Sequence, residues 1–181
     1  MKIAVFLGAG FGNTSYWRQF TEETGTWIGK NGHTLIYGGS KTGLMGVLAD
    51  AVLKEKGEVI GVETQDFIRL DVQHPALTKL IIAKDMAERK QIMIENADAY
   101  IAVPGGFGTL DEITEALNET KLHGGRKPVI FLNGQGYYDA LAGFFVHMEE
   151  CGFIPAAWKE FVHFVSDVSQ LDSVLKRKDR L

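Results

Sequence analysis

The fold is decided by residues 99–112, which read AYIAVPGGFGTLDE. Residues 99–103 are apolar and predict a short buried strand, and the glycines of 104–108 predict a tight turn. A helix is expected to follow from Thr109 to about Leu122. Because strand, turn and helix form the repeating unit of α/β proteins, this stretch predicts a parallel sheet covered by helices.

The same alternation extends in both directions along the chain. Strands are expected at 2–7, 33–37, 58–62, 79–83, 99–103, 129–132 and 161–165, and helices at 15–30, 44–56, 85–96, 109–122 and 138–150. Residues 63–78 predict a loop or a short helical turn, and a last helix is expected to end in the basic tail at 176–178. Right-handed crossovers then give a Rossmann-like, doubly wound parallel sheet with helices on both faces, in a single domain over residues 1–181.

Composition excludes several classes of protein. The 181 residues include 19 Lys and Arg against 23 Asp and Glu, and 45% are apolar, which is typical of a globular chain. No run approaches the ~18 apolar residues of a membrane span. The single Cys151 excludes a disulfide framework and suits a reducing cytoplasm, and the net charge of −4 argues against nucleic acid binding by bulk charge. We therefore expect a cytoplasmic protein whose partner is neither a membrane nor a nucleic acid.

Three glycine-rich turns follow predicted strands, at residues 8–12, 38–46 and 104–108. In a doubly wound sheet, ligands bind beyond the carboxyl ends of the strands, where these turns lie. At the third turn, backbone N–H groups and the positive end of the next helix can face an anion, and Thr109 adds a hydroxyl donor. Glycines also make tight turns for structural reasons alone, but three such turns at one end of a sheet favour a phosphate-binding nucleotide site.

Several familiar motifs are absent from the sequence. Asn13 follows the first turn where a dinucleotide fingerprint has its third glycine, and the acidic residue expected after the second strand is missing. No Walker-type phosphate loop can be aligned around Ser40, and Ser40 does not lie in a hydrolase nucleophile elbow. None of the five histidines has a recognised metal-ligand spacing, so no metal is expected.

The helix expected at 85–96 carries two cations on its apolar side. At about 100° per residue, the solvent side has Glu88, Gln91 and Glu95, and the opposite side has Met86, Ile92, Met93, Ile94 and Ala97. Arg89 and Lys90 fall on that apolar side, where a guanidinium is costly unless it pairs with an anion. Snorkelling or a structural salt bridge is the alternative explanation. Because the next strand leads to the 104–108 turn, Arg89 is placed to reach the same crevice.

Three acidic residues, Asp111, Glu112 and Glu115, lie in the first turns of the helix that follows 104–108. Carboxylates at this position suit the helix dipole, which is a sufficient structural explanation. A carboxylate just beyond a phosphate cradle is also well placed for the sugar of a bound nucleotide. Glu112 can accept hydrogen bonds from ribose hydroxyls or stabilise an oxocarbenium-like sugar.

Three strings together resemble the LONELY GUY (LOG) family: PGGFGTLDE at 104–112, MAERK at 86–90 and YGGSKTGLMG at 37–46. Its members are cytokinin riboside 5′-monophosphate phosphoribohydrolases, enzymes of cytokinin biosynthesis that are often mislabelled lysine decarboxylases. The resemblance covers nearly the whole chain. It implies a Rossmann-like homodimer that hydrolyses the N-glycosidic bond of an AMP-type nucleotide, giving free base and ribose 5-phosphate. It implies no cofactor, and it leaves open whether the base is adenine, an N6-modified adenine or another base.

The resemblance also assigns site residues. The catalytic arginine and glutamate of the family match Arg89 and Glu112. Its substrate-binding positions match these two residues and the following ones: Gly8, Gly10, Gly39, Ser40, Met86, Lys90, Gly105, Gly106, Phe107, Gly108 and Thr109. The chain departs from the common family pattern at Ala9 and Gly10, at Ser40, at Ala87 and at Asp111, which bears on substrate selectivity more than on the reaction.

Two alternatives remain at the level of sequence. The chain could be a non-catalytic carrier of a nucleotide or of the molybdenum cofactor, because such carriers have a related fold; base release from AMP separates a carrier from an enzyme. The other alternative is the lysine decarboxylase label. That chemistry ordinarily uses pyridoxal phosphate on a lysine, and the chain has no evident motif for this cofactor.

Overall fold

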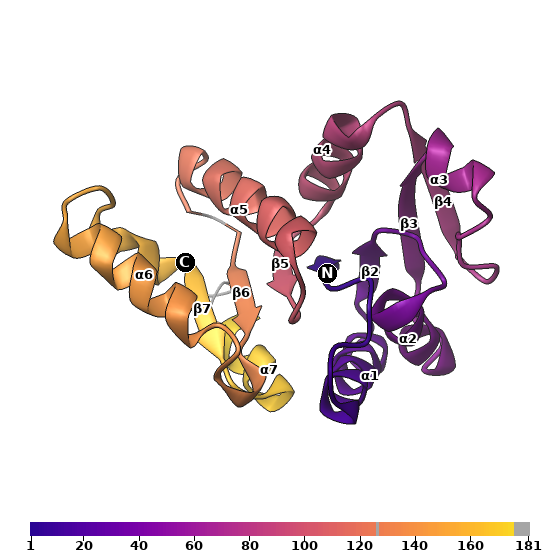
Figure 1. Ribbon diagram of the computed structural model, residues 1–181, viewed down its shortest axis with the longest axis horizontal. Coiled ribbons are helices and arrows are strands. Elements are labelled where there is room, and N and C mark those ends of the chain that lie inside the picture. The colour runs from indigo at the N-terminus through magenta and orange to yellow at the C-terminus, as the bar shows by residue number, and fades with distance from the viewer. Residues whose placement is uncertain (126, 176–181) are drawn as a thin grey trace.

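The computed structural model describes residues 1–125 and 127–175, which contain a seven-stranded parallel sheet (Figure 1). The strands are β1 (Lys2–Phe6), β2 (Thr34–Tyr37), β3 (Val59–Thr64), β4 (Lys79–Ala83), β5 (Ala99–Ala102), β6 (Val129–Leu132) and β7 (Val162–Val165). Their order across the sheet is β4-β3-β2-β1-β5-β6-β7, and each neighbouring pair is parallel. The predicted Rossmann-like α/β fold is confirmed.

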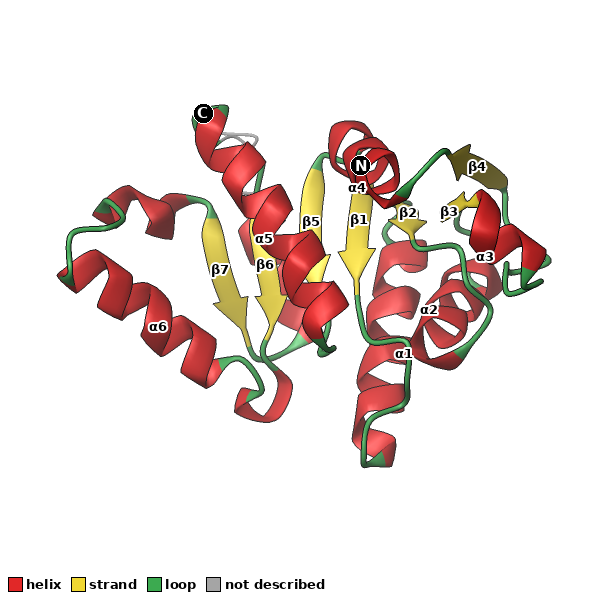
Figure 2. Cartoon of the chain, turned by 45° about the horizontal axis from the view of Figure 1, so that its top comes forward, coloured by secondary structure: helices red, strands yellow, loops and turns green. Residues whose placement is uncertain are grey.

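Helices cover both faces of the sheet (Figure 2). The α-helices of the described residues are α1 (Ser15–Lys30), α2 (Gly43–Lys54), α3 (Gln65–Arg69), α4 (Met86–Asn96), α5 (Phe107–Leu122), α6 (Asp139–Glu150) and α7 (Leu171–Leu175). Side chains of α1, α2 and α7 join one core cluster, and side chains of α4, α5 and α6 join the other. The sheet therefore separates two cores, as expected for a doubly wound domain.

The central strand β1 shows why the strand segments are apolar throughout. Ile3 and Val5 belong to the core on the α1 side, whereas Ala4 and Phe6 belong to the core on the α4 side. All four side chains are at most 1% exposed. A central parallel strand is buried on both faces, so its sequence is a continuous apolar run without alternation.

The direction of winding reverses between β1 and β5. From β1 the chain passes through α1 to β2 on one side, and from β5 it passes through α5 to β6 on the other. The turns that leave these two strands therefore diverge, and the carboxyl edge between them is the usual ligand site of this fold. The Gly8 N–H donates to the Pro104 carbonyl over 3.3 Å, so the first and third glycine turns lie side by side.

Three sequence expectations about local structure are wrong in detail. Helix α5 begins at Phe107 and not at Thr109, because Gly106 is already the extended N-cap residue. Strand β3 continues to Thr64, because Glu63 and Thr64 extend the ladder against β4, so these two residues are not part of a loop. The helical pattern places Met86 on the buried side, but it is the first residue of α4 and is 45% exposed.

The C-terminal tail and the length of the helices bear on two other expectations. The basic tail at 176–178, expected to end a helix, lies outside the described residues. No helix within the described residues has the length and apolar character that crossing a bilayer requires.

Candidate active site

A cavity of about 370 Å³ opens at the carboxyl edge of the sheet, where β1 and β5 diverge. Glycine turns supply part of its wall, two charged side chains face it from α4 and α5, and apolar side chains complete it. Its lining is Val5, Leu7, Gly8, Ala9, Gly38, Met45, Phe67, Arg89, Gly106, Gly108, Thr109 and Glu112. The three glycine turns that the sequence singles out therefore meet at one cavity.

The N-terminus of α5 presents hydrogen-bond donors to this cavity. Gly106 is the N-cap, and as a glycine it has no side chain that could cap the helix. The first backbone N–H groups of an α-helix have no partner inside the helix, so those of Phe107, Gly108 and Thr109 are available to an anion. The Thr109 side chain is buried, and its hydroxyl makes no hydrogen bond to any described residue. A buried hydroxyl without a partner costs about 1–3 kcal/mol, and a ligand oxygen would remove that cost.

Close packing fixes the turn in front of α5. A Cβ atom at Gly105 would lie 2.6 Å from the Gly8 nitrogen and 2.9 Å from the Thr109 Cβ, so only glycine fits there. The Tyr137 hydroxyl donates to the Gly105 carbonyl over 2.6 Å. The turn is therefore held from the β1 side and from the loop after β6, and its shape is set before any ligand binds.

Arg89 of α4 reaches the cavity from beneath the second glycine turn. Its side chain is buried, its Nη1 donates to Glu112 Oε1 over 2.7 Å, and its Nε donates to the Val62 carbonyl over 2.8 Å. A Cβ atom at Gly38 would collide with the Arg89 guanidinium, which explains the glycine at this position. The expectations that Arg89 points inward, pairs with an anion and reaches the strand-end crevice are confirmed.

Glu112 faces Arg89 from the second turn of α5, and its side chain is 15% exposed. Burial raises the pKa of the Glu112 carboxyl above its ordinary value, and the neighbouring Asp111 adds to this, although the charge and hydrogen bond of Arg89 act in the opposite direction. The carboxyl group therefore takes up a proton at a higher pH than an exposed glutamate does. Groups shifted in this way within a cavity are typical of catalytic sites.

Lys90 lies next to Arg89 in sequence but binds a different part of α5. Its ammonium is 3.0 Å from Asp111 and 2.5 Å from Glu115, and hydrogen bonds to these two carboxylates raise the pKa of Lys90. Asp111 and Glu115, which the sequence offered as candidates for a second catalytic carboxylate, are thus engaged by Lys90 outside the cavity lining. The substrate-binding role that the resemblance gives to Lys90 stays a prediction.

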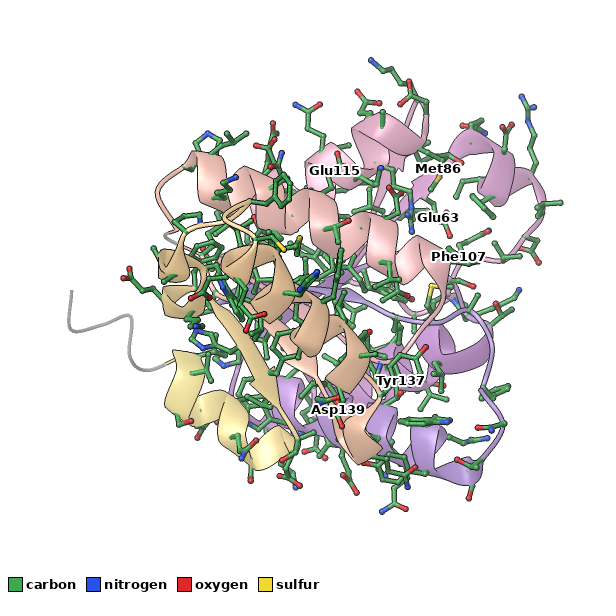
Figure 3. All side chains as sticks on the ribbon, turned by 60° about the vertical axis from the view of Figure 1, so that its left-hand side comes forward. Glu63, Met86, Phe107, Glu115, Tyr137 and Asp139 are labelled. Atoms are coloured by element: carbon green, nitrogen blue, oxygen red, sulfur yellow. The ribbon has the colours of Figure 1, made fainter. Side chains whose placement is uncertain are left out.

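The other predicted binding residues are not in the lining of the cavity. They are Gly10, Gly39, Ser40, Met86, Gly105 and Phe107. The Ser40 hydroxyl is 2.8 Å from the Thr42 hydroxyl, and Ser40 forms a bridge with Gln73. Phe107 projects from the first turn of α5 into solvent with 93% of its surface exposed (Figure 3). Of the predicted site residues, those that line the cavity are Gly8, Arg89, Gly106, Gly108, Thr109 and Glu112.

Three residues near the cavity escaped the sequence analysis. Met45 and Phe67 line it, and Glu63 is buried nearby, at the end of β3. Phe67 lies in a segment without periodicity. Met45 lies within the glycine-rich stretch 38–46, whose sequence does not indicate which way the side chain points. The signal for Glu63 was an acidic residue directly after the apolar residues of a strand. Within the described ranges, no three His, Cys, Asp or Glu side chains come together as a metal site.

Comparisons with known sequences agree on one family. The family model described as "Possible lysine decarboxylase" matches residues 45–175. A cytokinin riboside 5′-monophosphate phosphoribohydrolase of Rhodococcoides fascians is 38% identical over 168 residues, which cover 92% of this chain and 85% of the relative. An enzyme of the same name from Arabidopsis thaliana is 34% identical over 178 residues, which cover 98% of this chain and 83% of the relative.

Solved structures show the same fold at lower sequence identity. The molybdenum cofactor carrier protein of Chlamydomonas reinhardtii superposes with a TM-score of 0.74 at 24% identity, covering 99% of this chain and 98% of that one. The molybdenum cofactor binding protein of Rippkaea orientalis gives a TM-score of 0.73 at 23% identity, with coverage of 97% and 95%. At this level of identity the likeness concerns the fold alone.

Proposed function

Because this chain belongs to the LONELY GUY (LOG) family of cytokinin riboside 5′-monophosphate phosphoribohydrolases, we propose that it hydrolyses the N-glycosidic bond of nucleoside 5′-monophosphates. The substrates are AMP-type nucleotides, including those with an N6-modified adenine, and the products are free base and ribose 5-phosphate. The observation that carries the proposal is the cavity at the N-terminus of α5, where an unpartnered Thr109 hydroxyl lies beside a buried Arg89–Glu112 pair.

The phosphate is proposed to bind at the N-terminus of α5. The backbone N–H groups of residues 107–109 and the Thr109 hydroxyl can donate to the phosphate oxygens, and the helix dipole favours a dianion there. Gly105 and Gly8 keep the turn free of side chains, so the phosphate can approach the backbone closely. A nucleoside without the phosphate leaves these donors unpaired and should bind much more weakly.

The sugar is proposed to face Glu112. In the reaction, water adds to the anomeric carbon, the bond from that carbon to the base nitrogen breaks, and the base leaves with the electron pair and gains a proton. Glu112, when ionised, can stabilise the positive charge that develops on the sugar or accept the proton of the attacking water. Arg89 holds the Glu112 carboxylate in place over 2.7 Å, and its guanidinium can also contact the phosphate or assist the departing base.

A substrate panel tests this function. Purified protein is incubated with nucleoside monophosphates, the matching diphosphates and the matching nucleosides, and free base and ribose 5-phosphate are quantified. We expect equimolar products from monophosphates, and turnover at least about tenfold lower from nucleosides, because the nucleosides cannot use the phosphate donors. Including N6-isopentenyl-AMP beside AMP shows which base is preferred. Nucleotide binding without any base release would contradict the proposal and favour a carrier.

Lysine decarboxylation is disfavoured by the residues of the cavity. Pyridoxal phosphate forms a Schiff base with a lysine, and the cavity lining, taken over the described residues, includes none. The ammonium of Lys90, the lysine next to Arg89, is paired with Asp111 and Glu115. We expect neither carbon dioxide release from lysine nor pyridoxal absorbance in the purified protein.

The protein is further proposed to form a cytoplasmic homodimer with twofold symmetry. Phe107 and Met86 are 93% and 45% exposed at the N-termini of α5 and α4, close to the cavity, and large exposed apolar side chains there suit coverage by a second copy. Light scattering at micromolar protein should give twice the mass of one chain, and a monomeric mass would contradict the dimer.

A further inference from the structure

Glu63 is a buried carboxylate that the mechanism above does not use. It is 3% exposed and is the residue before the last of β3, in register with Ile82 of β4. The backbone of Thr64 lowers the pKa of its carboxyl, in opposition to the effect of burial. Buried carboxylates are costly unless they are paired with charge and hydrogen bonds.

The second glycine turn lies directly on Glu63. A Cβ atom at Gly39 would be 2.7 Å from Glu63 Cγ, and the backbone of Gly39 has a φ of +85°, which favours glycine for a second reason. Gly38, the neighbouring residue, covers the Arg89 guanidinium in the same way. The turn thus packs against both side chains: Arg89, which lines the cavity, and Glu63, which does not.

Charge connects Glu63 to the proposed catalytic pair. Arg89 Nε donates a hydrogen bond to the carbonyl of Val62, the residue before Glu63. Burial raises the pKa of Glu63, and the charge of Glu112 raises it further, whereas Arg89 lowers it. The titratable groups around Glu63 come from four elements: Arg89 of α4, Glu112 of α5, Tyr37 of β2 and, beyond Tyr37, Asp50 of α2, which pairs with His74.

The guanidinium of Arg89 pairs directly with Glu112, and its charge also lowers the pKa of the nearby Glu63. If both carboxylates are ionised, these three side chains together carry one net negative charge. The charge of Glu112 opposes the ionisation of Glu63, and because the repulsion between like charges is reciprocal, an ionised Glu63 opposes the ionisation of Glu112.

We propose that Glu63 is a positioning residue for the reaction: by sharing the charge of Arg89, it sets the pH at which Glu112 becomes ionised. This proposal rests on the proposed function for its catalytic consequence. Glu63 does not line the cavity, so it acts through the Arg89–Glu112 pair and not on the substrate.

The variant Glu63→Gln tests the proposal. The amide keeps the size of the side chain but removes the charge. Without that charge Glu112 ionises more easily, so the acidic limb of the pH profile of kcat/KM should move to lower pH by roughly one unit. The KM for the monophosphate at neutral pH should stay within about twofold, because the phosphate donors are untouched. An acidic limb that stays in place would overturn the proposal.

Two controls separate charge from packing. Asp66→Asn removes a carboxylate that is 89% exposed on the neighbouring α3, and it should leave the acidic limb in place. Glu63→Asp keeps the charge, and it should keep the limb near its original pH even if the shorter side chain lowers kcat. A limb that moves equally in Asp66→Asn and Glu63→Gln would mean that Glu63 has no special coupling to Glu112.

A second measurement does not depend on activity. Carboxyl ¹³C NMR of the folded protein follows the titration of Glu112 directly. We expect its midpoint to fall in Glu63→Gln relative to the wild type, and an unchanged midpoint would overturn the proposal. If the wild type releases no base from any nucleotide, the proposed function fails, whereas this titration still decides whether the two carboxyl groups are coupled.

Discussion

Two clusters of ion pairs join α4 to α5, and they begin at adjacent residues. In the inner cluster, Arg89 pairs with Glu112, and the two side chains are 9% and 15% exposed. In the outer cluster, Lys90, whose side chain is 17% exposed, pairs with Asp111 and Glu115, which are 62% and 38% exposed. Ion pairs whose carboxylates are exposed in this way stabilise a protein by little and need no functional explanation.

The inner cluster is not explained by stability alone. A buried ion pair often stabilises a protein less than apolar residues of the same volume, because its desolvation offsets the attraction. The Arg89–Glu112 pair also lines the cavity together with Thr109, whose hydroxyl has no partner among the described residues, whereas no residue of the outer cluster is in the cavity lining. Function therefore accounts for the inner cluster better than stability does, and the two clusters can be compared by substitution.

The largest combined effect is expected for Arg89→Met. This change leaves Glu112 buried without its partner, so the free energy of unfolding should fall by about 3–5 kcal/mol at neutral pH, and less at low pH where Glu112 takes up a proton. Base release should fall at least about 100-fold. Urea unfolding and a product assay measure the two effects. Arg89→Lys keeps the charge but loses the several N–H donors of the guanidinium, so its activity and stability should lie between those of the wild type and Arg89→Met. Full activity in Arg89→Met would show that Arg89 has no part in the mechanism.

The next effect is expected for Thr109→Val. The hydroxyl has no partner in the described chain, so its removal should leave stability unchanged or raise it by up to about 1 kcal/mol. The KM for a nucleoside monophosphate should rise by about tenfold, because a phosphate donor is lost.

Thr120→Val is the matched control for this change. Thr120 lies on the same helix, is equally buried, and also has a hydroxyl without a partner among the described residues, but it is not in the cavity lining. We expect no change in KM for this variant. An equal rise in KM in both variants would show that the effect comes from α5 packing and not from phosphate binding.

The inner cluster should also govern the pH dependence. The pKa of Glu112 is higher in the folded protein than in the unfolded chain. If activity needs the ionised form, it should begin to decline at a higher pH than it would with an exposed glutamate. By linkage, the contribution of Glu112 to stability is full below the unfolded pKa and is lost as the pH rises through the raised folded pKa. Profiles of kcat/KM and of unfolding against pH check both signs. An acidic limb at the pKa of an exposed glutamate would contradict this account.

The smallest effect is expected in the outer cluster. Lys90 pairs with two carboxylates, and Glu115→Gln replaces one of them by a neutral amide, so that the ammonium still pairs with Asp111. The free energy of unfolding should fall by about 0.2–1 kcal/mol, and base release should stay within about twofold of the wild type. A large loss of turnover without unfolding would show that the outer cluster belongs to the active site.

Most of the fold could be predicted from the sequence, because strands buried on both faces give continuous apolar runs bounded by glycine turns. The run at 2–7 and the string at 99–112 were sufficient for the parallel sheet. The start of α5 was placed two residues too late, because Gly106 caps the helix through its backbone and Phe107 is helical although its side chain is in solvent.

The candidate site was predicted where local sequence carries the geometry. Helical periodicity predicts that Arg89 points inward. The position of Glu112 shortly after the third glycine turn predicts that it lies at the same edge of the sheet as Arg89. Glu63 could not be found in this way, because only the pairing of β3 with β4 and the tertiary approach of α4 place it under the second turn. Phe67 and Met45 reach the cavity from segments whose direction depends on tertiary packing.

The most direct test of the account uses Glu112→Gln, in which turnover and nucleotide affinity are measured on the same preparation. Base release from AMP or N6-isopentenyl-AMP should fall at least about 100-fold, while the dissociation constant for the nucleotide stays within about threefold and the protein remains folded. Turnover close to that of the wild type would contradict the account, because the buried glutamate beside Arg89 would then have no part in cleaving the glycosidic bond.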